Sequence, residues 1–281
     1  MSWLPGSSSN PYQAEGGGDD PFARPPDVFA PPPGFEDDDI PTIDDAMLHG
    51  EVDFEAGMSA FPLFSLGLIL ACIAVFVCQV AGNGLEDEKR ISAMGALDPD
   101  LVHQGEIWRL VSATFMHGNF EHLMSNMVIL FVLGMSCEHG FGRPQYLFLY
   151  VGAGLFGSIF SLMGGRLSVG ASGAIFGLAG ALIALFWRHQ NKLHLRDRRI
   201  GVVIGLWAAF QIVLGLLNPN IDNLAHFGGL VGGVVLGLVL RPAVLEGRRE
   251  VAYHPLTLSA FVLTSGCLAA ASVFFIPRLI H

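Results

Sequence analysis

Charged residues are scarce in this 281-residue chain. Asp, Glu, Lys and Arg together make up 14% of it, whereas 52% of the residues are hydrophobic and the mean hydropathy is positive at +0.51. A soluble domain carries about 25% charged residues, so this composition excludes an ordinary soluble fold. It indicates a protein whose outer surface lies largely in hydrocarbon.

Basic residues are nearly absent from the first sixty positions, where Arg24 stands against thirteen Asp or Glu. Nine of the sixteen prolines also lie there, and the segment has no apolar periodicity. It cannot bury enough apolar surface to fold, so we expect residues 1–58 to be a disordered cytoplasmic tail. Its acidity argues against nucleic acid as a partner. The start "MSWLPGSSSN" is not a signal peptide, so the first span must act as the insertion signal.

Patterns that bind metals or cofactors are missing as well. The four cysteines have neither metal-ligand nor redox spacing and are interpreted as packing residues; they are Cys72, Cys78, Cys137 and Cys267. His117 and His122 do not form a two-histidine helical motif with a nearby acid. No motif for adenine or phosphate is present, so we expect neither a metal nor a cofactor.

Long apolar runs are what the chain has in quantity. They predict an all-α polytopic membrane protein with seven transmembrane helices. We place the spans at 61–81, 120–137, 145–164, 172–187, 200–217, 224–240 and 256–276. Residues 59–241 then form a core of six transmembrane helices, and residues 242–281 add a linker and a seventh. The fourth and sixth spans are the shortest, and both begin with unusual polar residues.

The loop charges suggest an orientation. With the N-terminus inside, nine Lys and Arg lie in the inner loops and five on the outer side. Inner loops normally carry the excess, so we expect a cytoplasmic N-terminus, in a cell (inner) membrane, and any site at the outer ends of the spans would open to the non-cytoplasmic face. The second, fourth and sixth spans then all begin at the outer face.

Polar residues inside the predicted spans gather at that same face. Ser172 begins the fourth span and His226 the sixth, and His117, His122 and Asn126 enter the second. Intramembrane polar groups are costly and normally face a protein interior or a water-filled cavity. The five residues at one depth therefore predict a site.

Small residues indicate which spans meet there. Gly173 and Gly177 are followed by Gly180 or Ala181 at helical spacing, and Gly229, Gly233 and Gly237 recur every four residues. Such stripes let two helix backbones approach closely, so we expect the fourth and sixth spans to pack together. That packing would bring Ser172 and His226 together.

Serine needs a base to become a nucleophile, and neutral imidazole is the usual one. No carboxylate lies at this depth to orient His226, and Asp222, in the loop, is left unassigned; the ring of Phe176 could hold the imidazole instead. The helix start at Ser172 offers backbone N–H groups to an oxyanion, and His122 and Asn126 could add side-chain donors.

Each residue alone has a simpler interpretation. Ser172 could be a small packing residue, His226 a proton relay or a satisfied core group, and Asn126 a polar contact between helices. A transporter should show internal repeats and an acidic residue at mid-membrane, and neither is present. A structural scaffold would not need these polar groups at one depth.

The motifs resemble those of the rhomboid intramembrane serine proteases over roughly residues 61–240. "GASGAIFG" is similar to the family's nucleophile segment and "AHFGGLVGG" to its base-bearing segment; "HGNFEHLMSN" matches its histidine and asparagine pattern. "EIWRLVSATFMH" and "GMSCEHGFG" resemble its long first loop and a pattern of Gly134, Glu138 and Gly142 that supports that loop.

The resemblance implies a role for each matched residue. Ser172 would be the nucleophile and His226 the general base, with His122 and Asn126 stabilising the oxyanion. The supporting residues would be Gly170, Gly173, Phe176, Gly229, Gly233, Trp108, Arg109, Glu138 and His117. Trp108 and Arg109 could either anchor the loop at the membrane interface or pack it. Glu138 is expected to close a hydrogen-bond network to loop or helix-end groups.

The resemblance to the rhomboid family also implies that the protein cleaves single-pass membrane proteins within or near their spans and uses no cofactor. Local unwinding of the substrate helix would have to precede attack, because a helix hides its peptide bonds. A gate is expected around Trp207, Phe210 and "NPNIDN". An inactive relative that binds membrane clients would lack the nucleophile or the base, and this chain has both.

Overall fold

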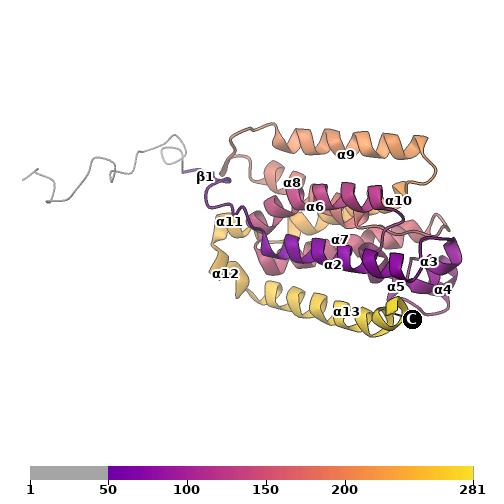
Figure 1. Ribbon diagram of the computed structural model, residues 1–281. Helices are drawn as coiled ribbons and strands as arrows, with labels where there is room; N and C mark the ends of the chain where they lie inside the picture. The colour runs from indigo at the N-terminus through magenta and orange to yellow at the C-terminus, as the bar shows by residue number, and fades with distance from the viewer. Residues whose placement is uncertain (1–49, 281) are drawn as a thin grey trace, which may run out of the picture. The chain divides into compact units, whose positions relative to one another are not determined.

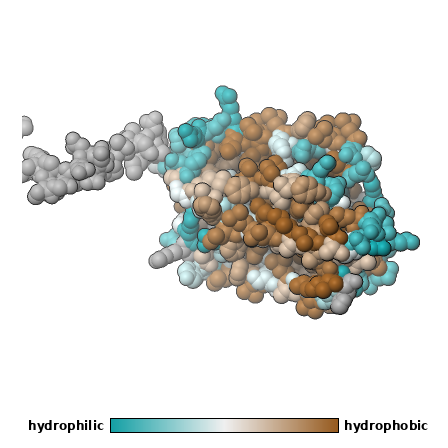
Figure 2. All heavy atoms as spheres, viewed as in Figure 1, coloured by the Kyte–Doolittle hydropathy of each residue, from teal (hydrophilic) through white to brown (hydrophobic). Residues whose placement is uncertain are grey.

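The computed structural model describes residues 50–280, which form a bundle of helices (Figure 1). The expected tail falls mainly on residues 1–49 and so lies outside the described residues. Apolar side chains cover the middle of the bundle in the view of Figure 2, and polar ones gather at its two ends. This distribution is the one expected of a protein that crosses a bilayer.

Seven long helices correspond to the seven predicted spans. They are α2 (Leu63–Ala81), α6 (Phe120–Phe141), α7 (Arg143–Leu162), α8 (Ser172–Arg188), α9 (Ile200–Leu217), α10 (Asn223–Val239) and α13 (Pro255–Ile280). Six are long and apolar enough to span a membrane, α10 when it is counted together with α11 (Ala243–Glu246), and α8 is shorter at 17 residues. The predicted all-α polytopic fold is confirmed.

Helices α7, α8 and α10 form the centre of the bundle, and glycine lets them approach. A β-carbon at Gly229 would overlap the carbonyl oxygen of Gly173, and one at Gly233 would overlap that of Gly177. A β-carbon at Gly237 would come within 2.8 Å of Ala181. The expected packing of the two glycine stripes is therefore present, with no room for a side chain between the backbones.

The long connection between α2 and α6 carries short helices: α3 (Glu88–Met94), α4 (Pro99–His103), α5 (Arg109–Ser112) and the 3₁₀ turn η2 (Ala113–Phe115). Asp87 caps α3 and Asp98 caps α4, each with its side chain accepting backbone N–H bonds. The pKa of Asp98 is lowered, first by the hydrogen bond from the Ser92 hydroxyl at 2.6 Å.

Arg109 holds this connection together from inside. Its side chain is only 2% exposed, and Nη1 donates to the carbonyl oxygens of Ser92 at 2.6 Å and Ala96 at 2.8 Å. The guanidinium also lies 4.7 Å from the ring of Trp108. Trp108 and Arg109 thus pack the loop, which was one of the two roles that their interfacial position allowed; both are too buried to anchor the loop in the headgroup region.

Glu138 binds the start of α2. Its carboxylate accepts hydrogen bonds from the backbone N–H groups of Phe64 and Ser65 and from the Ser65 hydroxyl, so it caps the start of α2. The long first loop leaves the opposite end of α2, after Ala81. Glu138 thus closes a hydrogen-bond network to helix-end groups, one of the two kinds of partner expected for it, because a helix start has unpaired N–H groups. A role of Gly134 and Gly142 in supporting the loop stays a prediction.

The described residues also begin before the boundary expected at residue 58. Strand β1 (Val52–Asp53) pairs in parallel with β2 (Leu193–His194), in the loop between α8 and α9. Phe54 is 2% exposed, and its ring lies edge-on to those of Phe186 and His139, with centroids 5.1 and 5.2 Å away. Residues 50–58 thus pack on the bundle rather than belonging to a tail. Two short strands leave the all-α character intact.

Candidate active site

Ser172 is fixed by the loop that precedes it. Leu97 and Ser168 exchange two backbone hydrogen bonds, at 2.9 and 3.0 Å, and the N–H of Gly170 donates to the carbonyl of Ala113 at 2.9 Å. Gly170 has φ of +141°, a conformation that favours glycine. The chain then turns directly into α8 with Ser172 as its first residue.

Gly170 also makes room for a neighbouring ring. A β-carbon there would come within 2.8 Å of His122 Cε1 and 3.0 Å of His122 Nε2, and 3.6 Å from Ser172 Oγ. The His122 ring and the Ser172 hydroxyl therefore lie beside the same backbone atom. A glycine is required at this position both for its backbone angle and for this close approach.

His226 lies in the first turn of α10, beside the start of α8. Its ring stacks on that of Phe176, with centroids 4.2 Å apart and an interplanar angle of 10°. This is the contact expected from the position of Phe176 one turn after Ser172. In the described structure Ser172 and His226 share no hydrogen bond, and His226 Nδ1 has no partner.

The loop acid Asp222 has a structural task. Its side chain accepts from the N–H of Ala225 at 2.9 Å, which caps α10, and it also receives a hydrogen bond from the Ser161 hydroxyl of α7. Asp222 therefore sets the start of the helix that carries His226. No hydrogen bond joins Asp222 to that imidazole within residues 50–280.

Asn126 lies one turn after His122 on α6, as their spacing predicted. It is 8% exposed, and its Nδ2 is a buried donor with no partner among the described residues. A buried amide without a partner is uncommon and calls for an explanation such as a ligand or a reacting group. Asn119 starts the helix by accepting the N–H of His122 at 2.8 Å.

His117 is fully buried in the loop before α6. Its backbone exchanges two hydrogen bonds with the side-chain amide of Gln79, each 3.1 Å long, and its ring lies 5.3 Å from that of His122. Burial, followed by the nearby His122, lowers the pKa of His117 to about 3. The imidazole is therefore neutral near pH 7.

A small cavity behind Gly170 and Gly173 was not predicted. Its volume is about 20 Å³, enough for one water molecule. Three serines on its wall were not singled out from the sequence, namely Ser158, Ser161 and Ser168. Serines in helices are common, and only the fold shows that these face the region behind the nucleophile.

Of the expected gate residues, Trp207 lies near this site. The Trp207 ring is 5.3 Å from that of Phe176, whereas Phe210 is exposed on α9. Only 17% of the residues of α9 are buried, the smallest share among the six helices that are long enough to span a membrane. Among the described residues, no three His, Cys, Asp or Glu side chains could hold a metal ion together.

Comparison with known proteins gives the family. The Rhomboid domain matches residues 104–243, which include Ser172, His226, His122 and Asn126. The chain belongs to the rhomboid family. Within this rhomboid chain, the matched region covers α6 to α10 and most of the packed glycines.

Several curated relatives of this rhomboid chain are similar over the same region. RHOMBOID-like protein 5 of Arabidopsis thaliana is 43% identical over 155 residues, 52% of this chain and 48% of the relative. The Rhomboid protease GluP of Bacillus subtilis is 35% identical over 173 residues, 61% and 34% of the two chains. The Rhomboid-like protease 2 of Toxoplasma gondii is 27% identical over 224 residues, 73% and 75%. The first two matches span half or less of the relative.

Proposed function

We propose that this protein is an intramembrane serine endopeptidase that cleaves single-pass transmembrane proteins within or near their spans. The observation that carries the proposal is the contact between α8 and α10. Gly229 lies against Gly173, which places a serine and a stacked histidine in the first turns of adjoining helices. Relatives named as rhomboid proteases support the same activity.

In the proposed reaction, His226 takes the proton of the Ser172 hydroxyl while Ser172 Oγ attacks the scissile carbonyl carbon. The imidazolium then gives its proton to the leaving amine, and the peptide C–N bond breaks. Water, deprotonated by His226, attacks the acyl-enzyme and releases the new carboxyl group and the Ser172 hydroxyl. Stacking on Phe176 supplies the ring orientation that an acid supplies in a three-residue triad.

The negative charge of the tetrahedral intermediate requires donors. Asn126 has an unpaired, buried amide, and the His122 ring lies beside Ser172 at Gly170. Backbone N–H groups at the start of α8 add to these because the first turn of a helix leaves them unpaired. We assign Asn126, His122 and this helix start to the oxyanion hole.

The test is cleavage of a single-pass substrate by the purified, detergent-solubilised protein. Ser172→Ala and His226→Ala should each abolish cleavage, whereas Ser125→Ala should retain it. Ser125 is a matched control because it lies exposed on α6 near the same end and bonds only to the carbonyl of His122.

A fluorophosphonate probe distinguishes an inactive relative from a protease with a strict substrate. Labelling of wild type that disappears in Ser172→Ala supports the assignment even where no test substrate is cut. Labelling that survives Ser172→Ala would overturn it.

A further inference from the structure

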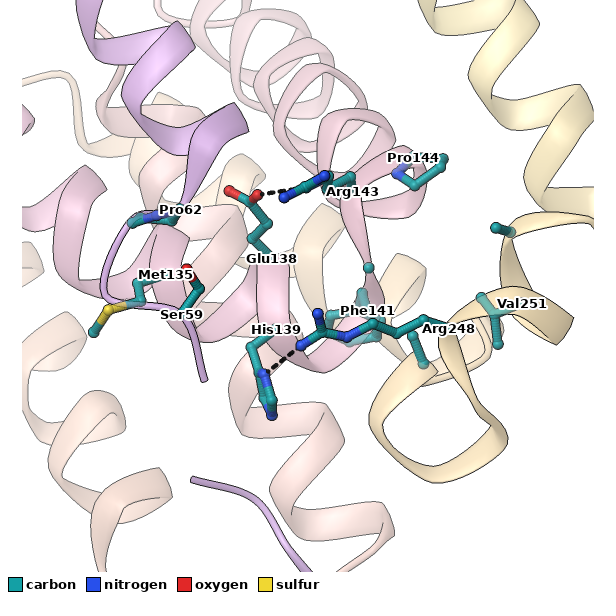
Figure 3. A pocket seen from close by; sticks show the side chains of 13 residues that line it. Ser59, Pro62, Met135, Glu138, His139, Phe141, Arg143, Pro144, Arg248 and Val251 are labelled. Atoms are coloured by element: carbon teal, nitrogen blue, oxygen red, sulfur yellow. Dashed lines mark hydrogen bonds and ion pairs between the residues drawn. The ribbon is translucent and has the colours of Figure 1, made fainter. Parts of the chain in front are cut away.

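A larger cavity in the described residues lies far from the proposed active site. Its volume is about 260 Å³, and it opens at the end of the bundle where α2 begins and α6 ends (Figure 3). His139 on its wall is thirteen residues after Asn126 on α6, a distance of about 20 Å along the helix axis. The cavity therefore takes no part in the proposed reaction.

Two arginines line this cavity from different elements. Arg143 begins α7, and its Nε bonds Glu138 at 3.3 Å. Arg248 begins α12 (Arg248–Ala252), and its Nη2 bonds His139 Nδ1 at 3.0 Å and the carbonyl of Gly57 at 3.4 Å. Figure 3 shows both side chains directed toward the end of α6. Each guanidinium keeps further N–H groups that these bonds do not use.

The acid on the wall is already neutralised. Glu138 accepts from two backbone N–H groups and a hydroxyl at the start of α2, in addition to Arg143. His139 is 7% exposed, and because Nδ1 receives a bond from Arg248, its proton is on Nε2. The cavity wall thus presents a net positive charge with spare donors.

Apart from Ser59, the side chains on the remaining wall are apolar. This wall includes Pro62, Met135, Phe141, Pro144 and Val251, and it lies where the helices end. A cavity with arginine donors and an apolar wall, at the depth where a bilayer has its headgroups, matches the chemistry of a phospholipid with an anionic headgroup. Planar guanidinium groups bind phosphate oxygens in pairs, and the net positive charge of the wall favours a lipid with a net negative charge over a zwitterionic one.

We propose that this cavity binds the phosphate of an anionic phospholipid, held between Arg143 and Arg248. The bound lipid joins three segments that are distant in the sequence: the residues before α2, the turn from α6 to α7, and α12. A soluble phosphate compound shares this chemistry, so the experiment must separate the two sources.

The measurement is native mass spectrometry of the purified full-length protein in neutral detergent, titrated with phosphatidylglycerol and, in parallel, with phosphatidylcholine. We expect one phosphatidylglycerol to bind more tightly than phosphatidylcholine. Arg143→Gln combined with Arg248→Gln should weaken it roughly ten-fold or more, because two charges at the surface are lost.

The matched control is Lys192→Gln combined with Arg199→Gln. These residues are exposed at the same end of the bundle, in the loop between α8 and α9, and do not line the cavity. We expect this pair to retain affinity within about two-fold of wild type. Equal weakening in both pairs would mean that lipid responds only to general surface charge, and would overturn the proposal.

A second variant keeps both arginines. Ala252→Phe fills the cavity from α12 and should also remove the tight lipid, so the test stands if the double arginine variant fails to fold. Inorganic phosphate at millimolar concentration should not displace phosphatidylglycerol. Displacement would assign the cavity to a soluble phosphate compound and overturn the lipid as its ligand. None of these measurements depends on proteolysis.

Discussion

At the scale of single residues, the unpaired amide of Asn126 is the most informative feature of the candidate site. A buried donor without a partner costs free energy in the resting protein. An unpaired amide at this position is explained if the amide gains a partner during the reaction. The developing oxyanion is such a partner.

We therefore expect Asn126→Ala to lower kcat roughly 10- to 100-fold, because one of several donors is lost. The thermal midpoint of the variant should stay within a few degrees of wild type, since no hydrogen bond of the described structure is broken. Measuring kcat and Tm together separates this from misfolding. An unchanged kcat would remove Asn126 from the oxyanion hole.

His117 gives a pH dependence that can be isolated. Its folded pKa of about 3 lies below the ordinary value of 6.5, so between these values the unfolded chain binds more protons than the folded one. The contribution of this pKa difference to the free energy of unfolding is complete above pH 6.5 and is lost as the pH falls toward 3. At pH 5 the loss relative to pH 7 is about 2 kcal/mol.

His117→Phe should remove that part of the acid sensitivity. The fall in Tm between pH 7 and pH 5, measured in detergent, should shrink by about 4–8 °C relative to wild type. His103→Phe is the control, because His103 is exposed in α4. If both variants show the wild-type slope, the imidazole of His117 is not the group that titrates.

At the scale of elements, the contact between α8 and α10 depends on glycine, which has no side chain to separate the two backbones. Valine at Gly229 would meet the backbone of Gly173, which cannot move aside as a flexible side chain can. Gly229→Val should therefore abolish cleavage and lower Tm. Gly67→Val is the matched control, since Gly67 lies in α2 with no atom near its missing β-carbon. Wild-type turnover by a well-expressed Gly229→Val protein would show that the contact is dispensable.

The elements that sequence predicts well are those determined by local pattern. The seven helices follow from apolar run length, and the α8 to α10 contact follows from glycine at every fourth position. Ser172, His226, His122 and Asn126 could be gathered in one layer because alternating helices carry their starting residues to one face. Stacking of Phe176 on His226 followed from the same helical spacing.

The elements that sequence does not predict depend on long-range contacts. Nothing local indicates that Val52 pairs with Leu193, about 140 residues away, or that α2 is the helix whose start Glu138 caps. The partners of Arg109 are backbone carbonyls, which every residue offers equally. Such contacts follow only from the packed structure.

At the scale of the whole molecule, residues 50–58 connect the N-terminal side of the chain to the ends of three helices. Phe54 inserts between Phe186 of α8 and His139 of α6, and Glu51 faces Arg198 just before α9 at 3.7 Å. The exposed ion pair adds little, so the buried ring supplies most of the stabilisation.

Two truncations locate this contribution. Removal of residues 1–57 eliminates Phe54 and should lower Tm by about 5 °C or more, as Phe54→Ala should, because burial of a large aromatic side chain is lost. Removal of residues 1–49 leaves Phe54 and the β1 pairing in place and should change Tm by less than about 2 °C. Phe61→Ala controls for loss of an exposed aromatic, since Phe61 is 74% exposed. Equal destabilisation by both truncations would instead place the stabilising contacts within residues 1–49. The packing of Phe54 between α6 and α8 would then contribute little to the stability of the bundle.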